Sequence, residues 1–301
     1  VLFLVSEGYR YLGRYDLALE VDSQLVANSA KLYGKESEEY IISLGYLAGT
    51  YRGLEDYVMS LELNLLAMSL VEMHLSLNQR IYALALQRLG GSYSDLENYT
   101  KALDLELQSL KIKENIFGED DPRYATILVN VGATYSKLKE HEKALSYKLK
   151  SVKISKNIYG KRHRFYILSL YNLASTYSDL GDYNKALSIQ LEVLELTRDM
   201  YGEKHQDYIK YLNNLVITYL QLGEFLNAKD LVNKYLKLIK ELKGDDNLSF
   251  ALGCWNKSLC HFYLNEFDSL YYPLIHNQEI LLKHIKLYEN NLNEDLYTQI
   301  Y

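Results

Sequence analysis

The sequence contains little proline, little cysteine and no long apolar run. Only 2 prolines occur in 301 residues. Proline removes a backbone donor and clashes inside helices, so this scarcity favours a chain built almost wholly of helix. Cys254 and Cys260 do not have the spacing of a metal site and are expected to be reduced core residues. No apolar stretch reaches the roughly 18 residues that a membrane span needs, and no signal peptide is visible. We therefore expect a cytoplasmic protein with no membrane partner.

The sequence also lacks a large excess of either positive or negative charge. The net charge of −6 is mild and gives no general reason to expect nucleic acid as a partner. Tyrosine, in contrast, is abundant, with 30 tyrosines against 7 phenylalanines and 1 tryptophan. Because tyrosine is a poor intrinsic helix former, its abundance in a helical chain indicates packing positions.

An internal repeat of 42 residues runs through the chain. The string YSDLGDYNKAL, Tyr177–Leu187, has counterparts without insertion or deletion at every step of 42 residues. The other copies begin at Tyr9, Tyr51, Tyr93, Tyr135, Tyr219 and His261. A second column in the same register contains Gly34, Gly118, Gly160, Gly202 and Gly244. A period of this length predicts stacked helical hairpins, each of which buries its apolar faces against its neighbours.

One unit shows how the hairpin is expected to form. Apolar residues at helical spacing predict a first helix over 166–180 and a second from Tyr183 to about Met200. Gly181 and Asp182 between them supply the turn, because glycine can end one helix and aspartate can cap the next. A small residue recurs in each helix where the two must approach closely, for example Ala174. In the second helix we expect these side chains to be buried: Ala186, Leu187, Leu191, Leu194 and Leu196.

The repeat predicts an all-α fold, a right-handed α/α superhelical solenoid that forms a single array over 1–301. Its expected units are 1–34 with a truncated start, 35–76, 77–118, 119–160, 161–202, 203–244 and a divergent seventh at 245–285, followed by 286–301 as the start of a C-terminal helix or capping segment. In the seventh unit Leu270 replaces the small residue, and Pro273 falls inside the second helix. That helix is expected to kink or to start late.

These columns resemble the tetratricopeptide repeat. The 42-residue unit, with Tyr-Gly-x-x-His at Tyr159–His163 and Tyr201–His205, is similar to the repeats of kinesin light chains and of bacterial arrays that can precede caspase-like CHAT protease domains. The resemblance implies a scaffold that binds a protein or peptide in its concave groove. The alternative is a regulatory or sensor arm of a larger enzyme, such as a CHAT protease, in which the partner is another domain of the same longer chain.

The resemblance also gives the positions that face the groove, two and three residues before the small residue of each first helix. These positions hold Arg88, Asn130, Tyr171, Asn172, Asn213, Asn214, Trp255 and Asn256. The asparagines could hydrogen-bond the backbone of an extended peptide, or each could tie its own hairpin to the next. Arrays that clamp the C-terminal carboxylate of chaperones place lysine three before the small residue. This chain has Gly45, Gln87 and Tyr171 there, so that clamp is absent.

Basic residues are concentrated in one stretch. Lys137–Arg164 contains ten basic residues against Glu140 and Glu142. The candidate docking surface for an acidic partner consists of Lys148, Lys153, Lys156, Lys161, Arg162 and Arg164. The alternative is a solvated outer face.

No catalytic or cofactor site is expected. His163 and His205 occupy equivalent repeat positions, which argues against a metal pair. No zinc-protease, serine-hydrolase or phosphate-loop motif occurs in the sequence. We therefore expect no catalysis and no cofactor.

Overall fold

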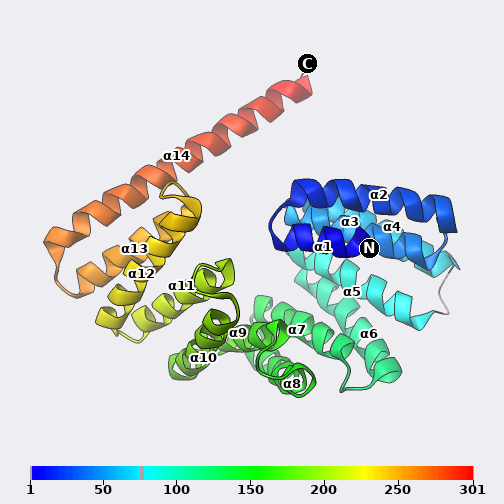
Figure 1. Ribbon diagram of the computed structural model, residues 1–301, viewed down its shortest axis with the longest axis horizontal. Coiled ribbons are helices and arrows are strands. Elements are labelled where there is room, and N and C mark those ends of the chain that lie inside the picture. The colour runs from blue at the N-terminus through cyan, green and yellow to red at the C-terminus, as the bar shows by residue number, and fades with distance from the viewer. Residues whose placement is uncertain (1, 75–77, 301) are drawn as a thin grey trace. The chain divides into compact units, whose positions relative to one another are not determined.

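A computed structural model describes residues 2–74 and 78–300, with side chains described as far as Lys283. Helices follow one another throughout these residues, and no strand occurs among them (Figure 1). The predicted all-α fold class is confirmed. The helices are α1 (Leu2–Tyr11), α2 (Tyr15–Tyr33), α3 (Glu38–Gly53), α4 (Tyr57–His74), α5 (Gln79–Asp95), α6 (Tyr99–Phe117), α7 (Pro122–Lys137), α8 (His141–Tyr159), α9 (Arg164–Asp179), α10 (Tyr183–Tyr201), α11 (Gln206–Gln221), α12 (Phe225–Lys243), α13 (Leu248–Tyr263) and α14 (Phe267–Ile300).

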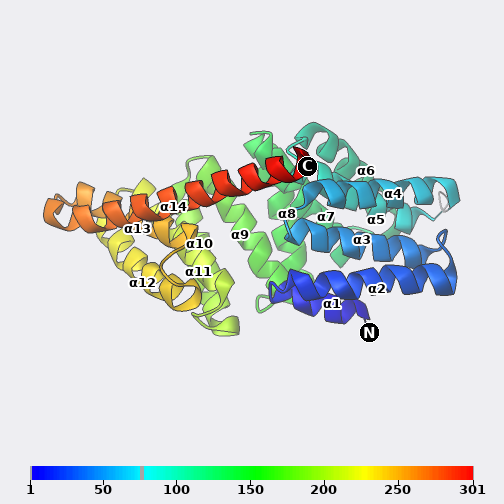
Figure 2. The same cartoon turned by 90° about the horizontal axis from the view of Figure 1, so that it is seen from above.

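The chain divides into two compact units, Val1–Gly160 with α1 to α8 and Lys161–Tyr301 with α9 to α14. In each unit, every helix packs against the next one along the chain, as hairpins joined by short turns (Figures 1 and 2). The division falls at a predicted repeat boundary. The predicted boundary between the second and third repeats, at 76/77, lies outside the described residues.

The turn inside each hairpin requires one residue in the left-handed backbone region. Gly181 has a φ of 77°, and the amide of Asp182 donates to the carbonyl of Tyr177 at 2.9 Å, which ends α9. The Asp182 carboxylate accepts from the amide of Lys185 and caps α10. The predicted roles of both residues are confirmed. The same turn position is occupied, with positive φ, by Gly13, Glu55, Glu97, Lys139, Gly223 and Asn265.

Replacing Glu97 with glycine is expected to stabilise the protein by about 1 kcal/mol. Glu97 has a φ of 60°, a conformation that costs a residue with a Cβ about 1–2 kcal/mol. Glycine relieves that strain, although its greater freedom in the unfolded chain offsets part of the gain. The midpoint of urea unfolding measures the change. Gly181→Ala is the converse control and should lower the midpoint. A lower midpoint for Glu97→Gly would contradict the account of the turn.

Small residues allow the two helices of a hairpin to touch. Ala48 and Ala174 on first helices are 1% exposed, and Ala102 and Ala186 on second helices are fully buried. A Cβ added to Gly90 on α5 would lie 3.2 Å from the carbonyl oxygen of Ala102 on α6. The hairpins therefore close backbone to backbone at these columns, as the repeat predicts.

The second helices bury a column of polar side chains that the sequence analysis missed. Its members, 42 residues apart, are Asp22, Asn64, Glu106, Lys148 and Gln190, each 7% exposed or less. In the first unit the partner often lies 28 residues later, on the next first helix. Thr50 donates to Asp22 at 2.6 Å, Asn64 donates to Ser92 at 2.9 Å, and Thr134 donates to Glu106 at 2.8 Å. Hydrogen bonds thus join successive hairpins through the core.

The predicted leucine stripe of α10 is partly wrong. Ala186 is buried as expected, but Leu191 is 44% exposed, and Leu187, Leu194 and Leu196 are half-buried. The buried residues are Ala186, Gln190, Val193 and Thr197. The buried face of this helix is therefore centred on the polar column, and the leucines lie beside it.

The prediction that the second helix of the seventh unit starts late is wrong. α14 begins at Phe267, in register with the earlier second helices, continues through Pro273 and runs to Ile300, past the end of α13 (Figure 1). Proline in a helix interior costs one hydrogen bond and about 3 kcal/mol, which a helix of 34 residues can absorb. Within the described residues, 286–300 belong to this same helix.

The remaining general expectations concern cysteine and the membrane. Cys254 and Cys260 are free and buried, and burial raises the pKa of each thiol to about 11. The prediction of reduced core cysteines is confirmed. Over the described part of the chain, no helix is long and apolar enough to cross a membrane.

Candidate binding groove

In the second unit, the predicted groove asparagines bond to neighbouring hairpins. The Asn214 amide on α11 donates to the hydroxyl of Tyr171 on α9 at 3.0 Å. The Asn256 amide on α13 donates to the Oδ1 of Asn213 on α11 at 3.3 Å. These two asparagines therefore tie neighbouring hairpins together, which was the second of the two expectations for them. Each bond leaves part of an amide unused, because no other described residue bonds to the Nδ2 of Asn213 or to the Oδ1 of Asn214.

A pocket of about 340 Å³ lies between α11, α12 and α13 and includes both of these residues. Lys210, Asn213 and Asn214 line it from α11, while Tyr235 and Lys243 line it from α12. The Lys210 ammonium lies 4.6 Å from the centre of the Tyr171 ring. Among the described residues, neither Lys210 nor Lys243 forms an ion pair. The pocket wall is therefore mixed, with apolar side chains, two lysines and the carboxylate of Asp207.

The sequence analysis did not predict three of the residues that line this pocket, Lys210, Tyr235 and Lys243. A signal for Lys210 exists in the repeat, because it occupies a column in which the neighbouring units carry Leu168 and Leu252. A charge that replaces an apolar residue in a repeat column is a departure that the sequence alone reveals.

Two groove residues at the end of the second unit differ in exposure. Trp255 on α13 is 45% exposed, whereas Asn256 beside it is 4% exposed. Asn172 on α9 is half-buried, and its side chain forms no hydrogen bond with any described residue. Trp255 and Asn172 thus remain accessible for a partner, and Asn256 serves the link to α11.

In the first unit, Arg88 reaches from α5 across to α3. Its Nη1 donates to the carbonyl oxygen of Ile42 at 3.2 Å, and its guanidinium lies 5.5 Å from the centre of the Tyr46 ring. Arg10 lies 5.3 Å from the centre of the same ring and donates to the carbonyl of Tyr46 at 2.9 Å. Burial lowers the pKa of Arg88 to about 10.

A second pocket of about 340 Å³ includes Arg88 and Asn130. Asn130 on α7 is half-buried, and its amide has no hydrogen-bond partner within the described residues. Arg88 and Asn130, predicted as neighbours along the groove, therefore line one pocket.

The prediction that Lys148 belongs to the basic docking surface is wrong. Lys148 is 4% exposed and donates to the hydroxyl of Ser136 at 2.8 Å, so it cannot belong to a docking surface. The reason is its place in the buried polar column of the second helices. Lys153 and Lys156 on α8 are exposed in the first unit. Lys161, Arg162 and Arg164 are exposed in the second unit, where Lys161 pairs with Glu192 at 3.1 Å.

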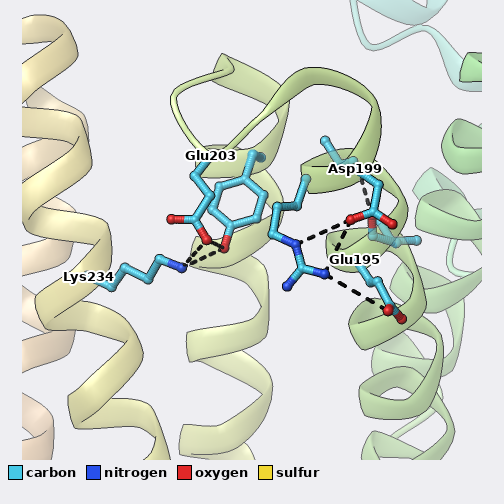
Figure 3. Close-up of polar contacts among 8 residues, drawn as sticks. Glu195, Asp199, Glu203 and Lys234 are labelled. Atoms are coloured by element: carbon cyan, nitrogen blue, oxygen red, sulfur yellow. Dashed lines mark hydrogen bonds and ion pairs between the residues drawn. The ribbon is translucent and has the colours of Figure 1, made fainter.

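A three-residue bridge recurs near the hairpin ends. Lys150 donates to Glu119 and to the hydroxyl of Tyr124, both at 2.8 Å. Two repeats later Lys234 donates to Glu203 at 2.6 Å and to Tyr208 at 2.9 Å. Figure 3 shows Lys234 reaching toward Glu203, while Glu195 and Asp199 lie on a different helix and pair with Arg198.

The intervening repeat has the same bridge with the charges exchanged. Lys161 stands at the position of Glu119 and Glu203, and Glu192 stands at the position of Lys150 and Lys234. The pair remains bonded, and the hydroxyl of Tyr166 donates to Glu192 at 3.3 Å.

Exchanging Glu203 and Lys234 is therefore expected to preserve stability. Each single variant, Glu203→Lys or Lys234→Glu, places like charges together and should lower the unfolding free energy by about 0.2–1 kcal/mol. The double variant should recover most of that loss, as Lys161 and Glu192 do naturally. A double-mutant cycle by urea unfolding measures the coupling. Additive losses would contradict the bridge.

The two repeat histidines cap helices. The Nδ1 of His163 accepts from the amide of Phe165 at 3.2 Å, and the Nδ1 of His205 accepts from the amide of Asp207 at 3.2 Å. They begin α9 and α11 respectively. No cluster of three or more histidine, cysteine or acidic residues in the described part of the chain could hold a metal ion.

Hairpins in register, with small-residue contacts and a buried polar column, define a helical repeat scaffold. The sequence matches the tetratricopeptide repeat family model over residues 82–157, 123–199 and 166–241. Because these matches together span more than half of the chain, the protein belongs to the tetratricopeptide repeat family. Folds of this family are generally non-enzymatic scaffolds. A comparison with curated proteins finds no match.

Solved structures show the same fold at low sequence identity. A kinesin light chain from Podosopora anserina with nearly identical TPR-like repeats has a TM-score of 0.61 and 14% identity, over 68% of this chain and 97% of that one. A STAND protein with a tetratricopeptide repeat sensor, from Pyrococcus horikoshii, has a TM-score of 0.66 and 18% identity, over 97% of this chain and 43% of that one. A Rap protein complexed with Competence and Sporulation Factor has a TM-score of 0.62 and 13% identity, over 89% and 80%. The predicted likeness to kinesin light chain repeats is thus matched at the level of the fold.

Proposed function

We propose that the protein is an interaction scaffold that binds an extended peptide segment along its first helices. The observation that carries this proposal is the pair of half-used amides on α11. Asn213 offers a donor and Asn214, its neighbour in sequence, offers an acceptor. An extended peptide presents carbonyls and amides to a neighbouring surface, so a donor and an acceptor in one pocket can each bond to its backbone.

The surroundings of α11 support the same proposal. Trp255 supplies an exposed aromatic surface of the kind that dominates binding energy at interfaces. Lys210 and Lys243 add charge that a partner can complement. The similar Rap protein was solved with a bound factor. We propose no catalytic role for this chain, and we propose that it acts in the cytoplasm.

Selection from a random peptide display library tests the proposal. The wild-type chain should enrich a related set of peptides, and Asn172→Ala/Asn214→Ala should bind them at least about tenfold more weakly. Asn184→Ala/Asn227→Ala is the matched control, because it removes two exposed asparagines from the second helices α10 and α12. This control should bind like the wild type. No enrichment, or equal binding by both double variants, would rule out the groove.

A second candidate is the sensor or regulatory arm of a larger enzyme. The STAND protein favours it, because 97% of this chain matches 43% of that protein, which has a tetratricopeptide repeat sensor. The gene sequence on both sides of the given chain tests this candidate. A catalytic domain on either side, with a histidine and cysteine pair in the case of a CHAT protease, would support it, and a full-length protein made of repeat hairpins alone would contradict it.

A further inference from the structure

The pocket in the first unit contains one guanidinium that has no carboxylate partner. Arg88 has five N–H donors, and only Nη1 has an acceptor among the described residues, the carbonyl of Ile42. The Tyr46 ring lies 5.5 Å from its guanidinium, and the charge of Arg10 acts on it as a second cation. The Nε and Nη2 donors of Arg88 are thus left without an acceptor.

The other charged residues of the pocket wall are paired with each other. Arg52 holds Asp95 through two contacts of 2.7 Å, and Arg10 lies 3.7 Å from Asp22. Lys113, which is 6% exposed, donates to Gln87 on the pocket wall. Burial, together with Arg123 and Arg88, lowers the pKa of Lys113 to about 8. The pocket therefore carries an excess of positive charge.

The pocket wall also offers unused hydrogen-bonding groups. Asn130 has a free amide, and Gln87 uses only its Oε1. The Oδ1 of Asn64, a lining residue that is 5% exposed, has no hydrogen-bond partner within the described residues. The amide donors of Asn130 and Gln87 suit a ligand that accepts hydrogen bonds.

The absence of a side chain at Gly45 makes room for the Arg88 guanidinium. A Cβ on Gly45 would overlap the Arg88 side chain, so Arg88 can lie against α3 only because no side chain stands there. The planar guanidinium is then held at a fixed orientation in the pocket. A fixed guanidinium with two adjacent free donors matches the two oxygens of a carboxylate.

We propose that this pocket binds a carboxylate, held by Arg88 and hydrogen-bonded by Asn130. Within the described residues, Arg88 is the cation of the pocket wall that has no carboxylate partner, which suits a monoanion, and the nearby Asp95 disfavours a phosphate dianion. The site is not the chaperone clamp, because Gln87 stands in the lysine column of that clamp. The inference shares with the proposed function only the assumption that the first helices line a groove. The test of the proposed function concerns α9 to α13 in the second unit, so the two proposals can fail separately.

Titration of the full chain with small probes tests the site. The probes are acetate, the capped peptide acetyl-Gly-Glu-Gly-amide, its Gln counterpart and inorganic phosphate. Binding is followed by the NMR shift of the Arg88 Nε–H. The Glu peptide should bind at least about tenfold more tightly than the Gln peptide, because a charge-assisted hydrogen bond contributes that much. Acetate binding as tightly as the Glu peptide would point to a free small acid as the source.

Variants locate the binding group. Arg88→Gln should weaken binding of the Glu peptide at least about tenfold, and Arg88→Lys should lose part of it because the planar fork is gone. Arg80→Gln is the matched control, since Arg80 is exposed on the same helix, and it should bind like the wild type. Should Arg88→Gln fail to fold, the comparison of Glu and Gln peptides on the wild type still decides. Equal binding of the two peptides, no binding of any carboxylate, or preference for phosphate would overturn the proposal.

Discussion

Glu106→Gln is expected to stabilise the protein by about 3 kcal/mol at pH 8 and to have almost no effect near pH 4. Glu106 on α6 is 2% exposed, and burial raises the pKa of its carboxyl to about 7. Only the hydroxyl of Thr134, at 2.8 Å, and the more distant Arg52 oppose that shift. Above pH 7 the folded protein must therefore bury a carboxylate with one neutral hydrogen-bond partner.

The sign follows from the raised pKa. The unfolded carboxyl titrates near its ordinary value of 4.5, and the folded one near 7. The stability contributed by the protonated group is present below about pH 4.5 and is lost as the pH rises to 7. A difference of this size corresponds to roughly 3 kcal/mol. Glutamine keeps the oxygen that accepts from Thr134 and has no charge, so it avoids the loss.

Urea unfolding of both proteins between pH 4 and pH 8 measures the effect. Asp104→Asn is the matched control, because Asp104 is exposed on the same helix, and its stability should follow the wild type at every pH. A difference between Glu106→Gln and the wild type that does not grow with pH would show that Glu106 titrates normally.

Gly90→Leu and Gly91→Leu are expected to have opposite effects although the residues are adjacent. A Cβ on Gly90 would lie 3.0 Å from the Cγ of Glu106 and 3.2 Å from the backbone oxygen of Ala102, so a leucine must push α6 away from α5. Such overpacking costs about 1–3 kcal/mol, and more where backbone must move. A Cβ on Gly91 would meet nothing within 4 Å, and leucine there should gain about 0.5–1 kcal/mol of helix propensity.

The pair thus serves as its own control. Thermal unfolding should place Gly90→Leu well below the wild type and Gly91→Leu at or above it. Equal destabilisation of both variants would mean that the first-helix small column does not set the distance between the two helices of the hairpin.

The fold was accessible from the sequence because its signals repeat. The 42-residue step predicted α10 to begin at Tyr183, as it does, and Gly181 and Asp182 predicted the turn and the cap. The columns Ala174 and Ala186 predicted the contact within the hairpin. Each signal is local, or is repeated at a fixed spacing, so a single sequence contains enough information.

The buried polar column was not found because it contradicts the usual pattern of apolar burial. Lys148 was assigned to a surface by its charge, and Leu191 was assigned to the core by its apolarity. The repeat does contain a signal for the column. Polar residues at one position of the second helices are followed 28 residues later by Thr50, Ser92 or Thr134. Only the packing of successive hairpins shows that the two positions meet.

Photo-crosslinking of a display-selected peptide tests most directly whether the first helices bind the partner. The peptide would carry a photoreactive residue at each position in turn, and the crosslinked residues would be mapped by mass spectrometry. The proposal predicts crosslinks on the first helices, at Asn172, Lys210, Asn213 and Trp255, and their loss in Asn172→Ala/Asn214→Ala. Crosslinks confined to the second helices, for example at Lys153 and Lys156, would contradict it.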